Sequence, residues 1–366
     1  MTTLDRILHH LKNLVAFDTQ NPPRAIGRDD AIFTYLKDAL LACPQSDNKG
    51  DQWQVTITDH DEGRVTFHAT KGNPNLLFNV HLDTVPNGEG WSHDPLDVIV
   101  KDGKAFGRGT CDIKGAAAAL LTLAETGVED MALLFTTDEE GTGSCCVREF
   151  CSGYDTSAYK AVIVAEPTSS KAVLGHRGYL SARGDFTGTQ GHTSSAGATS
   201  DSALSHLTKW TASALALADD DGDGPHKNNR FNLGRIEGGI KPNMVANKAH
   251  VLWGMRPQPG SDGGSIFTQL TDTPEGSKAK WTVSFAAPSL PAAGKTRDGS
   301  EAFINDQNLT QGDDVDFWTE ASLFSDAGLN ALVLGPGNIT EAHAIDEWVA
   351  LDQLELAYAQ YAKLVG

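Results

Sequence analysis

The chain has 366 residues, of which 40% are hydrophobic, and it carries a formal net charge of −19 with a pI of about 4.9. This length and composition suit a globular protein of two domains. The acidic balance argues against nucleic acid and anionic membranes as partners, because both require a basic surface, but it is compatible with a site that holds cations.

The amino-terminal segment, residues 1–17, has the apolar spacing of an amphipathic helix. It lacks the basic start, apolar block and small-residue cleavage site of a secretory leader. No apolar stretch approaches the roughly 20 residues that span a bilayer. The five cysteines form no CxxC pair, which favours reduced thiols. We therefore expect a cytoplasmic protein with no membrane partner.

Short apolar runs alternate with helix-forming stretches in the first half of the chain. The runs NLLFNVHLD, MALLFTTDEE and AVIVAEP end in polar residues, and IKGAAAALLTLAETG between the first two favours a helix. A further apolar run, NALVLGPG, precedes a closing helix at LDQLELAYAQYAKLVG. Runs that are apolar on both faces predict a parallel or mixed sheet covered by helices.

The pattern changes between residues 177 and 288. Strands are expected at GYLSARGDFTG, RFNLGRIEGG, KAHVLWGMRP and KAKWTVSFAAP, and helices at DSALSHLTKWTASALALADD and GSIFTQLTD. The order β-α-β-β-α-β is that of a ferredoxin-like unit. We therefore predict an α/β protein in which residues 1–176 and 289–366 form one domain, and residues 177–288 form an inserted α+β domain.

Two motifs imitate known binding loops without matching them. DDDGDG, at residues 219–224, has the acidic spacing of an EF-hand calcium loop, but Arg230 stands where that loop requires a glutamate. GTGSCC, at residues 141–146, lacks the third glycine of a dinucleotide-binding fingerprint. We expect a solvated turn at the first motif and no nucleotide site at the second.

Four of the apolar runs lead to a residue that can bind a metal ion, and a fifth candidate stands between a glycine-rich turn and a helix. In open α/β sheets, ligands bind beyond the carboxyl ends of neighbouring parallel strands, so these side chains are expected to gather in one crevice. Each residue alone also fits a core or loop position, but their joint placement favours a metal site. The five are His81, Asp112, Glu140, Glu166 and His343.

Imidazole and carboxylate ligands suit zinc, with cobalt or manganese as alternatives. Two divalent ions would offset the clustered negative charge, and the two oxygens of Asp112 can bridge them. Asp83 shares a strand face with His81 and is predicted to hold its ring. Of the neighbours Glu139 and Glu140, one is expected to bind a metal ion and the other to stay free as a general base for hydrolysis by an activated water.

Five motifs occur in an order that resembles a known family: HLDTVP, GRGTCDIKG, TTDEEGTG, AEPT and GPGNITEAHAIDE. The family comprises co-catalytic metallopeptidases and deacylases, among them acetylornithine deacetylase, succinyl-diaminopimelate desuccinylase and carboxypeptidase G. The resemblance runs from the amino-terminal helix to the last strand. It implies a zinc-peptidase-like mixed sheet flanked by helices, with an inserted ferredoxin-like lid through which two chains form a homodimer.

The resemblance also implies roles for individual residues. One metal ion would be bound by His81 and Glu166, the other by Glu140 and His343, with Asp112 bridging, Asp83 orienting His81 and Glu139 acting as the base. In the lid, GTQGHTSSAG implies that His192 reaches the active site of the partner subunit and polarises the scissile carbonyl; an exposed loop histidine is the alternative. Asn243 and Arg256 match positions that bind the substrate carboxylate, for which the arginine fork is suited. A salt bridge within the lid is the rival interpretation of Arg256.

Within the family, FWTEASLF resembles a segment of the acetylornithine deacetylases, and the GGTSDGR-like segment of the desuccinylases is absent. AFDTQNPPRAIG, FNVHLDTVP and the chain length are closest to the acetylcitrulline deacetylases. The implied reaction is hydrolysis of N-acetyl-L-citrulline or N2-acetyl-L-ornithine in arginine biosynthesis, with Glu320 expected to touch the distal side chain of the substrate.

Two other classes of function stay open. The chain is also compatible with a related desuccinylase, an aminoacylase or a small peptidase, and with a non-catalytic binding protein on the same fold. A serine hydrolase is disfavoured because no GxSxG motif occurs.

Overall fold

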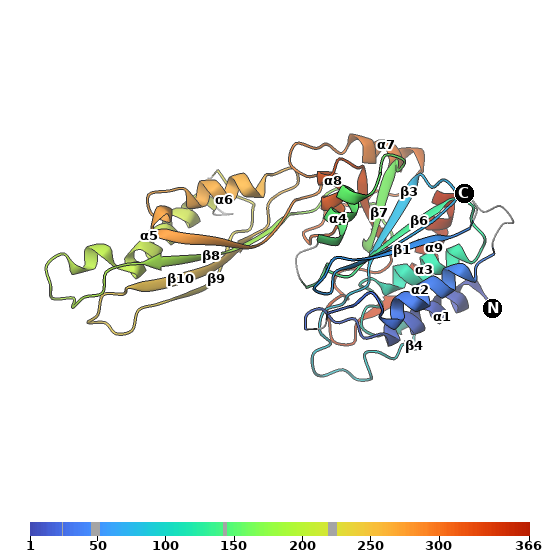
Figure 1. The fold of residues 1–366 in the computed structure, drawn as a ribbon, viewed down its shortest axis with the longest axis horizontal. Helices are drawn as coiled ribbons and strands as arrows, with labels where there is room; N and C mark the ends of the chain where they lie inside the picture. The colour runs from blue at the N-terminus through green and yellow to red at the C-terminus, as the bar shows by residue number, and fades with distance from the viewer. Residues whose placement is uncertain (24, 45–51, 142–144, 219–224) are drawn as a thin grey trace. The chain divides into compact units, whose positions relative to one another are not determined.

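The computed structural model describes the chain except for residues 24, 45–51, 142–144 and 219–224 (Figure 1). The DDDGDG motif therefore lies outside the described residues, as do residues 142–144 of GTGSCC. The chain divides into two compact units. Unit 1 comprises Met1–Leu174, Arg297–Asp314 and Thr319–Gly366, and unit 2 comprises Gly175–Thr296 and Val315–Trp318.

Unit 1 is built on a six-stranded sheet in the order β1-β2-β6-β3-β7-β12. The neighbours β6, β3, β7 and β12 are parallel, whereas β1 and β2 are antiparallel to each other and β2 is antiparallel to β6. This confirms the predicted mixed sheet, and it makes the four apolar runs adjacent strands whose carboxyl ends lie at one edge. The strands are β1 (Gln54–Asp59), β2 (Val65–Lys71), β3 (Leu76–His81), β6 (Met131–Thr136), β7 (Ala161–Pro167) and β12 (Ala331–Gly335).

Helices cover both faces of this sheet. Figure 1 shows α1, α2, α3 and α9 on one face and α4 and α8 on the other. All residues of the four parallel strands are buried, which explains why their sequences are nearly continuous apolar runs. The helices of unit 1 are α1 (Thr3–Ala16), α2 (Ala31–Leu41), α3 (Lys114–Ala124), α4 (Cys145–Gly153), α7 (Asp298–Asp306), α8 (Ala321–Asp326) and α9 (Leu351–Val365).

A second, three-stranded sheet of unit 1 was not expected from the sequence. Its order is β13-β5-β4, with β4 at Ile99–Lys101, β5 at Lys104–Phe106 and β13 at Trp348–Ala350. β13 and β5 are antiparallel. Their pairing joins the segment that follows β12 to the loop that follows β5, and these two segments carry His343 and Asp112.

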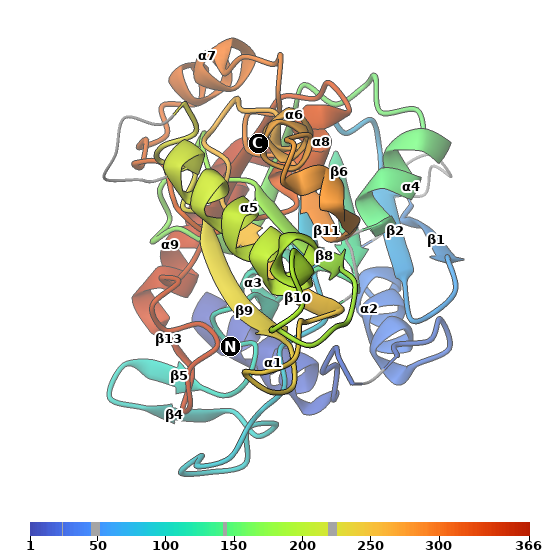
Figure 2. The same ribbon diagram turned by 90° about the vertical axis from the view of Figure 1, so that its left-hand side faces the viewer.

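Unit 2 is a four-stranded antiparallel sheet in the order β11-β8-β10-β9, with two main helices, α5 and α6 (Figure 2). The chain order β8-α5-β9-β10-α6-β11 is the predicted ferredoxin-like order. Alternate residues of β8 and β10 are buried in a core around Trp210 of α5. The elements are β8 (Tyr179–Thr187), α5 (Ala203–Ala218), β9 (Asn232–Gly238), β10 (Lys248–Met255), α6 (Gly263–Thr271) and β11 (Ala279–Ala287), with short 3₁₀ turns at Ala198–Asp201 and Gly276–Lys278.

Two sequence expectations concern the chain as a whole. Among the helices in the described ranges, none combines the length and apolar character needed to cross a membrane. The five cysteines all lie in described ranges, and none of them is paired in a disulfide. The catalytic and lid roles given to the two domains stay predictions.

Candidate metal centre

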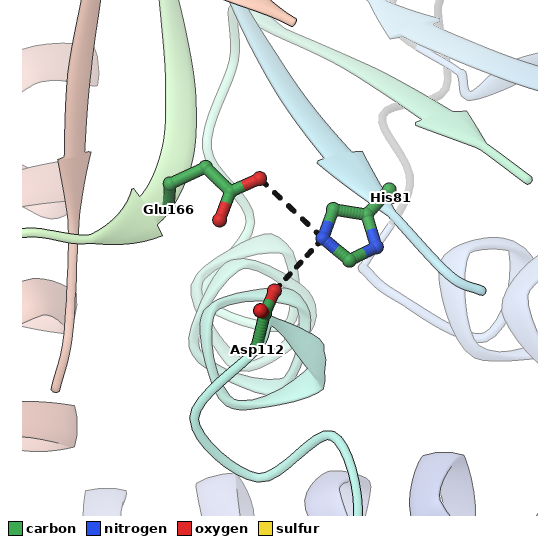
Figure 3. Close-up of side chains that lie close together, drawn as sticks. All are labelled: His81, Asp112 and Glu166. Atoms are coloured by element: carbon green, nitrogen blue, oxygen red, sulfur yellow. Dashed lines mark hydrogen bonds and ion pairs between the residues drawn. The ribbon is translucent and has the colours of Figure 1, made fainter. Parts of the chain in front are cut away.

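The structure brings the five predicted metal ligands together beyond the carboxyl ends of the parallel strands. His81 is the last residue of β3 and Glu166 lies at the end of β7. Figure 3 shows the carboxylates of Glu166 and of Asp112, which lies just before α3, both directed at the same ring nitrogen of His81. Glu140 follows β6, and His343 follows β12. The topology of the sheet therefore explains how residues far apart in sequence meet.

Asp112 stands between the two histidines, with one carboxylate oxygen facing each. Its Oδ1 lies 2.9 Å from Nε2 of His81, and its Oδ2 lies 3.1 Å from Nε2 of His343. Glu166 Oε1 lies 3.4 Å from the same nitrogen of His81, and Glu140 Oε1 lies 2.8 Å from that of His343. Each half of the cluster thus has a histidine, a terminal carboxylate and one oxygen of Asp112.

The donor set fits divalent metal ions. In each half, one possible ligand atom per residue lies within 4.8 Å of the others. The carboxylates of Asp112 and Glu166 are buried, and buried negative charge is costly unless it is paired or bound to a metal. Imidazole nitrogens with carboxylate oxygens are ligands that zinc, cobalt and manganese accept.

Burial and neighbouring charged groups shift the pKa values of the residues in the cluster. Burial, together with the charge of Asp112, raises the pKa of Glu166 to about 7. Burial and the neighbouring Glu140 raise the pKa of Glu139 well above its usual range. Hydrogen bonds to Asp112 and Glu140 raise the pKa of His343 to about 10. Cations bound among these groups would relieve the excess negative charge.

Asp83 contacts His81 in a different way from the one predicted. Nδ1 of His81 donates to the main-chain oxygen of Asp83 at 2.8 Å, whereas the nearer carboxylate oxygen is 3.6 Å away. This bond leaves Nε2 of His81 free to bind a metal ion. The Asp83 carboxylate accepts from the backbone N–H of Glu140 at 3.0 Å and from Nδ2 of Asn21 at 3.1 Å. Its side chain therefore holds the turn that carries Glu139 and Glu140.

Three buried residues at this site were not singled out in the sequence: Asn21, Arg108 and Glu347. Arg108 Nη1 donates to Glu347 Oε2 at 2.9 Å, beneath the loop that carries Asp112. Glu347 lies four residues after His343, and Asn21 precedes two prolines; neither position has a local pattern that indicates its contacts.

Glu320 is fully buried. Its Oε2 accepts a hydrogen bond from Oγ1 of Thr136 at 2.8 Å. Burial and the charge of Asp138 raise the pKa of Glu320 to about 8. From the sequence, this residue was predicted to contact the substrate, which requires an accessible carboxylate. In the structure the carboxylate of Glu320 is enclosed, so this prediction is wrong. The local motif did not reveal that the start of α8 packs under the sheet.

The remaining predicted residues lie in unit 2. His192 is exposed in a loop, where the backbone N–H of Ser194 donates to its Nδ1 at 3.2 Å. Asn243 is exposed as well. The guanidinium of Arg256 lies 4.3 Å from the ring centre of Tyr179, and both residues line a cavity of about 350 Å³.

In this protein, histidines and carboxylates gather beyond the carboxyl ends of the parallel strands of a mixed sheet, and a ferredoxin-like unit is inserted into the chain. This arrangement is that of a metal-dependent hydrolase. The sequence profile of peptidase family M20/M25/M40 matches residues 77–366. The chain belongs to this family, and the resemblance seen in its motifs is thereby confirmed.

Curated relatives and a solved structure cover nearly the whole chain. The N-acetyl-L-citrulline deacetylase of Xanthomonas campestris pv. campestris is 42% identical over 356 residues, which span 95% of this chain and 94% of the relative. The acetylornithine deacetylase of Aliivibrio fischeri is 29% identical over 87% of this chain and 90% of its own. The M20 family metallo-carboxypeptidase of Sulfolobus solfataricus has a TM-score of 0.72 at 15% identity, covering 99% of this chain and 98% of that one. The similarity to this solved structure shows that the two chains share a fold.

Proposed function

We propose that this protein hydrolyses the N-acetyl amide of an arginine-pathway amino acid to acetate and the free amino acid. The observation that carries the proposal is Asp112, whose two carboxylate oxygens face His81 and His343 separately. The 42% identity to an N-acetyl-L-citrulline deacetylase supports N-acetyl-L-citrulline as the substrate. The acetylornithine deacetylases, at 29% identity, make N2-acetyl-L-ornithine the second candidate.

Two divalent ions are proposed, one for each half of the cluster, with zinc first and cobalt or manganese as alternatives. His81 and Glu166 would hold one ion, Glu140 and His343 the other, and Asp112 would be shared. When bound, such a pair supplies Lewis acidity and lowers the pKa of a water molecule.

Glu139 is the proposed general base. It takes a proton from the attacking water and delivers it to the amide nitrogen, because an amine leaves poorly as an anion. The Asp83 carboxylate accepts a hydrogen bond from the backbone N–H of Glu140 at 3.0 Å. Its Oδ1 lies 3.4 Å from the backbone nitrogen of Glu139. These contacts keep the base and its neighbouring ligand at a constant spacing.

His192 is proposed to donate a hydrogen bond to the acetyl oxygen as negative charge develops there. The Ser194 N–H donates to Nδ1 of His192, which places the hydrogen of the neutral ring on Nε2. By resemblance this histidine acts in the site of a partner subunit, so a homodimer through unit 2 is part of the proposal. Asn243 and Arg256 are proposed to bind the substrate carboxylate. A cytoplasmic location stays a prediction.

A substrate panel tests the proposal. Acetate or amine release is measured with zinc or cobalt added, using N-acetyl-L-citrulline, N2-acetyl-L-ornithine, succinyl-diaminopimelate and dipeptides. The proposal expects one of the two N-acetyl substrates to be turned over fastest. Faster release from succinyl-diaminopimelate or a dipeptide would assign the related hydrolase instead. No release from any of them, with metal bound, would favour a binding protein.

A further inference from the structure

Three backbone N–H groups of the loop before α3 converge on the carboxylate of Glu347. The N–H of Gly109 donates to Oε2 at 3.0 Å, and those of Cys111 and Asp112 donate to Oε1 at 2.9 and 3.0 Å. Neighbouring backbone N–H groups that converge in this way form an anion-binding nest. In this protein the anion is a side chain of the same chain.

The Glu347 carboxylate is buried, with 1% of its side chain exposed, and its charge is balanced. Arg108 Nη1 donates to Oε2 at 2.9 Å. The Arg108 guanidinium is itself held in place, because it donates to the main-chain oxygen of Asn87 at 3.2 Å and lies 5.0 Å from the ring centre of Trp91. A buried carboxylate with three backbone donors and a guanidinium is fully satisfied, and losing one of these partners is costly.

The main chain fixes Glu347 on both sides. The backbone N–H of Gly107 donates to the Glu347 carbonyl at 2.9 Å. The next residue, Trp348, begins β13 and pairs with Phe106 of β5. Because His343 lies four residues earlier in the same segment, Glu347 connects the segment of one histidine ligand to the loop that carries the shared aspartate.

We propose that Glu347 is a positioning residue that fixes the Asp112 loop so that Asp112 faces both halves of the metal centre. Asp112 has one carboxylate oxygen toward each histidine. A shift of the Asp112 backbone therefore removes one ligand oxygen from each half of the metal centre. Loss of a ligand that belongs to one half alone, such as His343, affects only that half. The inference rests on the metal centre of the proposed function and is independent of the substrate.

Metal binding by Glu347→Gln tests this inference. Zinc binding is measured by titration against a competing chelator, and cobalt absorption spectra report the ligand environment. The amide substitutes an NH₂ donor for one acceptor oxygen, so it faces N–H groups that it cannot bond. We expect the affinities for both metal equivalents to fall, each by roughly 10–100-fold. His343→Ala, in the same assay, should weaken one equivalent.

Asp346→Asn is the matched control. The Asp346 carboxylate accepts from the backbone N–H and the hydroxyl of Ser92 at 2.9 and 3.1 Å, and this variant should bind both equivalents as the wild type does. Circular dichroism of the metal-free proteins shows whether each variant is folded. If Glu347→Gln does not fold, Glu347→Asp, which keeps the charge on a shorter side chain, is judged by the same criterion.

A folded Glu347 variant that binds both equivalents with wild-type affinity, or that loses one alone, would overturn the inference. Failure of the proposed function has a different signature. If the wild type binds two ions but releases no acetate, the proposed substrate is wrong and the positioning role stands. If the wild type binds no ion, both are overturned.

Discussion

The hydroxyl of Thr136 donates to the buried carboxyl of Glu320 at 2.8 Å, and Thr136 pairs in the sheet with His81. A buried acidic side chain at the start of α8 therefore contacts the strand that pairs with the one carrying the metal ligand His81. Burial and the Asp138 charge raise the pKa of Glu320 to about 8, so this carboxyl is mostly protonated at neutral pH.

Glu320→Gln should stabilise the metal-free protein in mildly alkaline buffer. Between the ordinary glutamate pKa and about 8, the folded state keeps a proton that the unfolded state has released, so the wild type loses stability as pH rises through that window. The loss is on the order of a few kcal/mol. Melting temperatures at pH 5 and pH 8.5 measure it, and the variant should show a smaller fall.

Glu355→Gln, at an exposed position of α9, is the control and should follow the wild type. If Glu320→Gln instead raises the KM for substrate and leaves the pH dependence of melting unchanged, the substrate contact first expected from the sequence would be reinstated.

His68 should make the protein sensitive to acid. Burial lowers the pKa of His68 to about 4. As pH falls from 6.5 toward 4, the unfolded state binds a proton that the folded state excludes, so stability present above pH 6.5 is lost, by about 2 kcal/mol at pH 5. His68→Phe keeps a ring against Phe150 and Tyr154 and should lose less stability between pH 7 and pH 5 in urea unfolding. An equal loss in both proteins would contradict this origin.

Glu139→Gln should keep its metal and lose its activity. General acid–base catalysis typically contributes about 10²–10⁴ in rate, and the amide cannot accept the proton. Acetate release under saturating substrate, together with metal content by elemental analysis, checks both parts. Wild-type turnover by the metal-loaded variant would remove Glu139 from the mechanism.

His192→Ala should lower acetate release by about 10²–10³, the usual cost of one oxyanion donor. If this histidine acts in the partner's site, mixing His192→Ala with Glu139→Gln chains should restore some activity, because one of the two sites in a heterodimer then has both groups intact. Heterodimers that form but stay inactive would rule out the shared site.

The sequence predicted those parts of the site that follow from regular strands. His81, Glu140, Glu166 and His343 stand after fully apolar runs, and the order of parallel strands in an α/β sheet brings such ends together. Asp112 was predicted because it stands between a glycine-rich turn and a helix, where a carboxylate can bridge two cations with its two oxygens.

The rest depends on tertiary contacts that local sequence does not encode. Glu347 reaches the Asp112 loop through the pairing of β13 with β5, two strands of three residues each, which are too short for a clear alternation of apolar and polar residues. Glu320 was given a substrate contact because nothing in FWTEASLF distinguishes a buried glutamate from an exposed one.

Anomalous X-ray diffraction from crystals grown with zinc tests most directly whether these five residues hold a pair of metal ions. Two zinc peaks are expected, roughly 3.5–4 Å apart, one beside His81 and Glu166 and one beside Glu140 and His343, with Asp112 between them. Absence of both peaks at saturating zinc, or zinc bound elsewhere on the chain with these residues unliganded, would contradict the proposed centre.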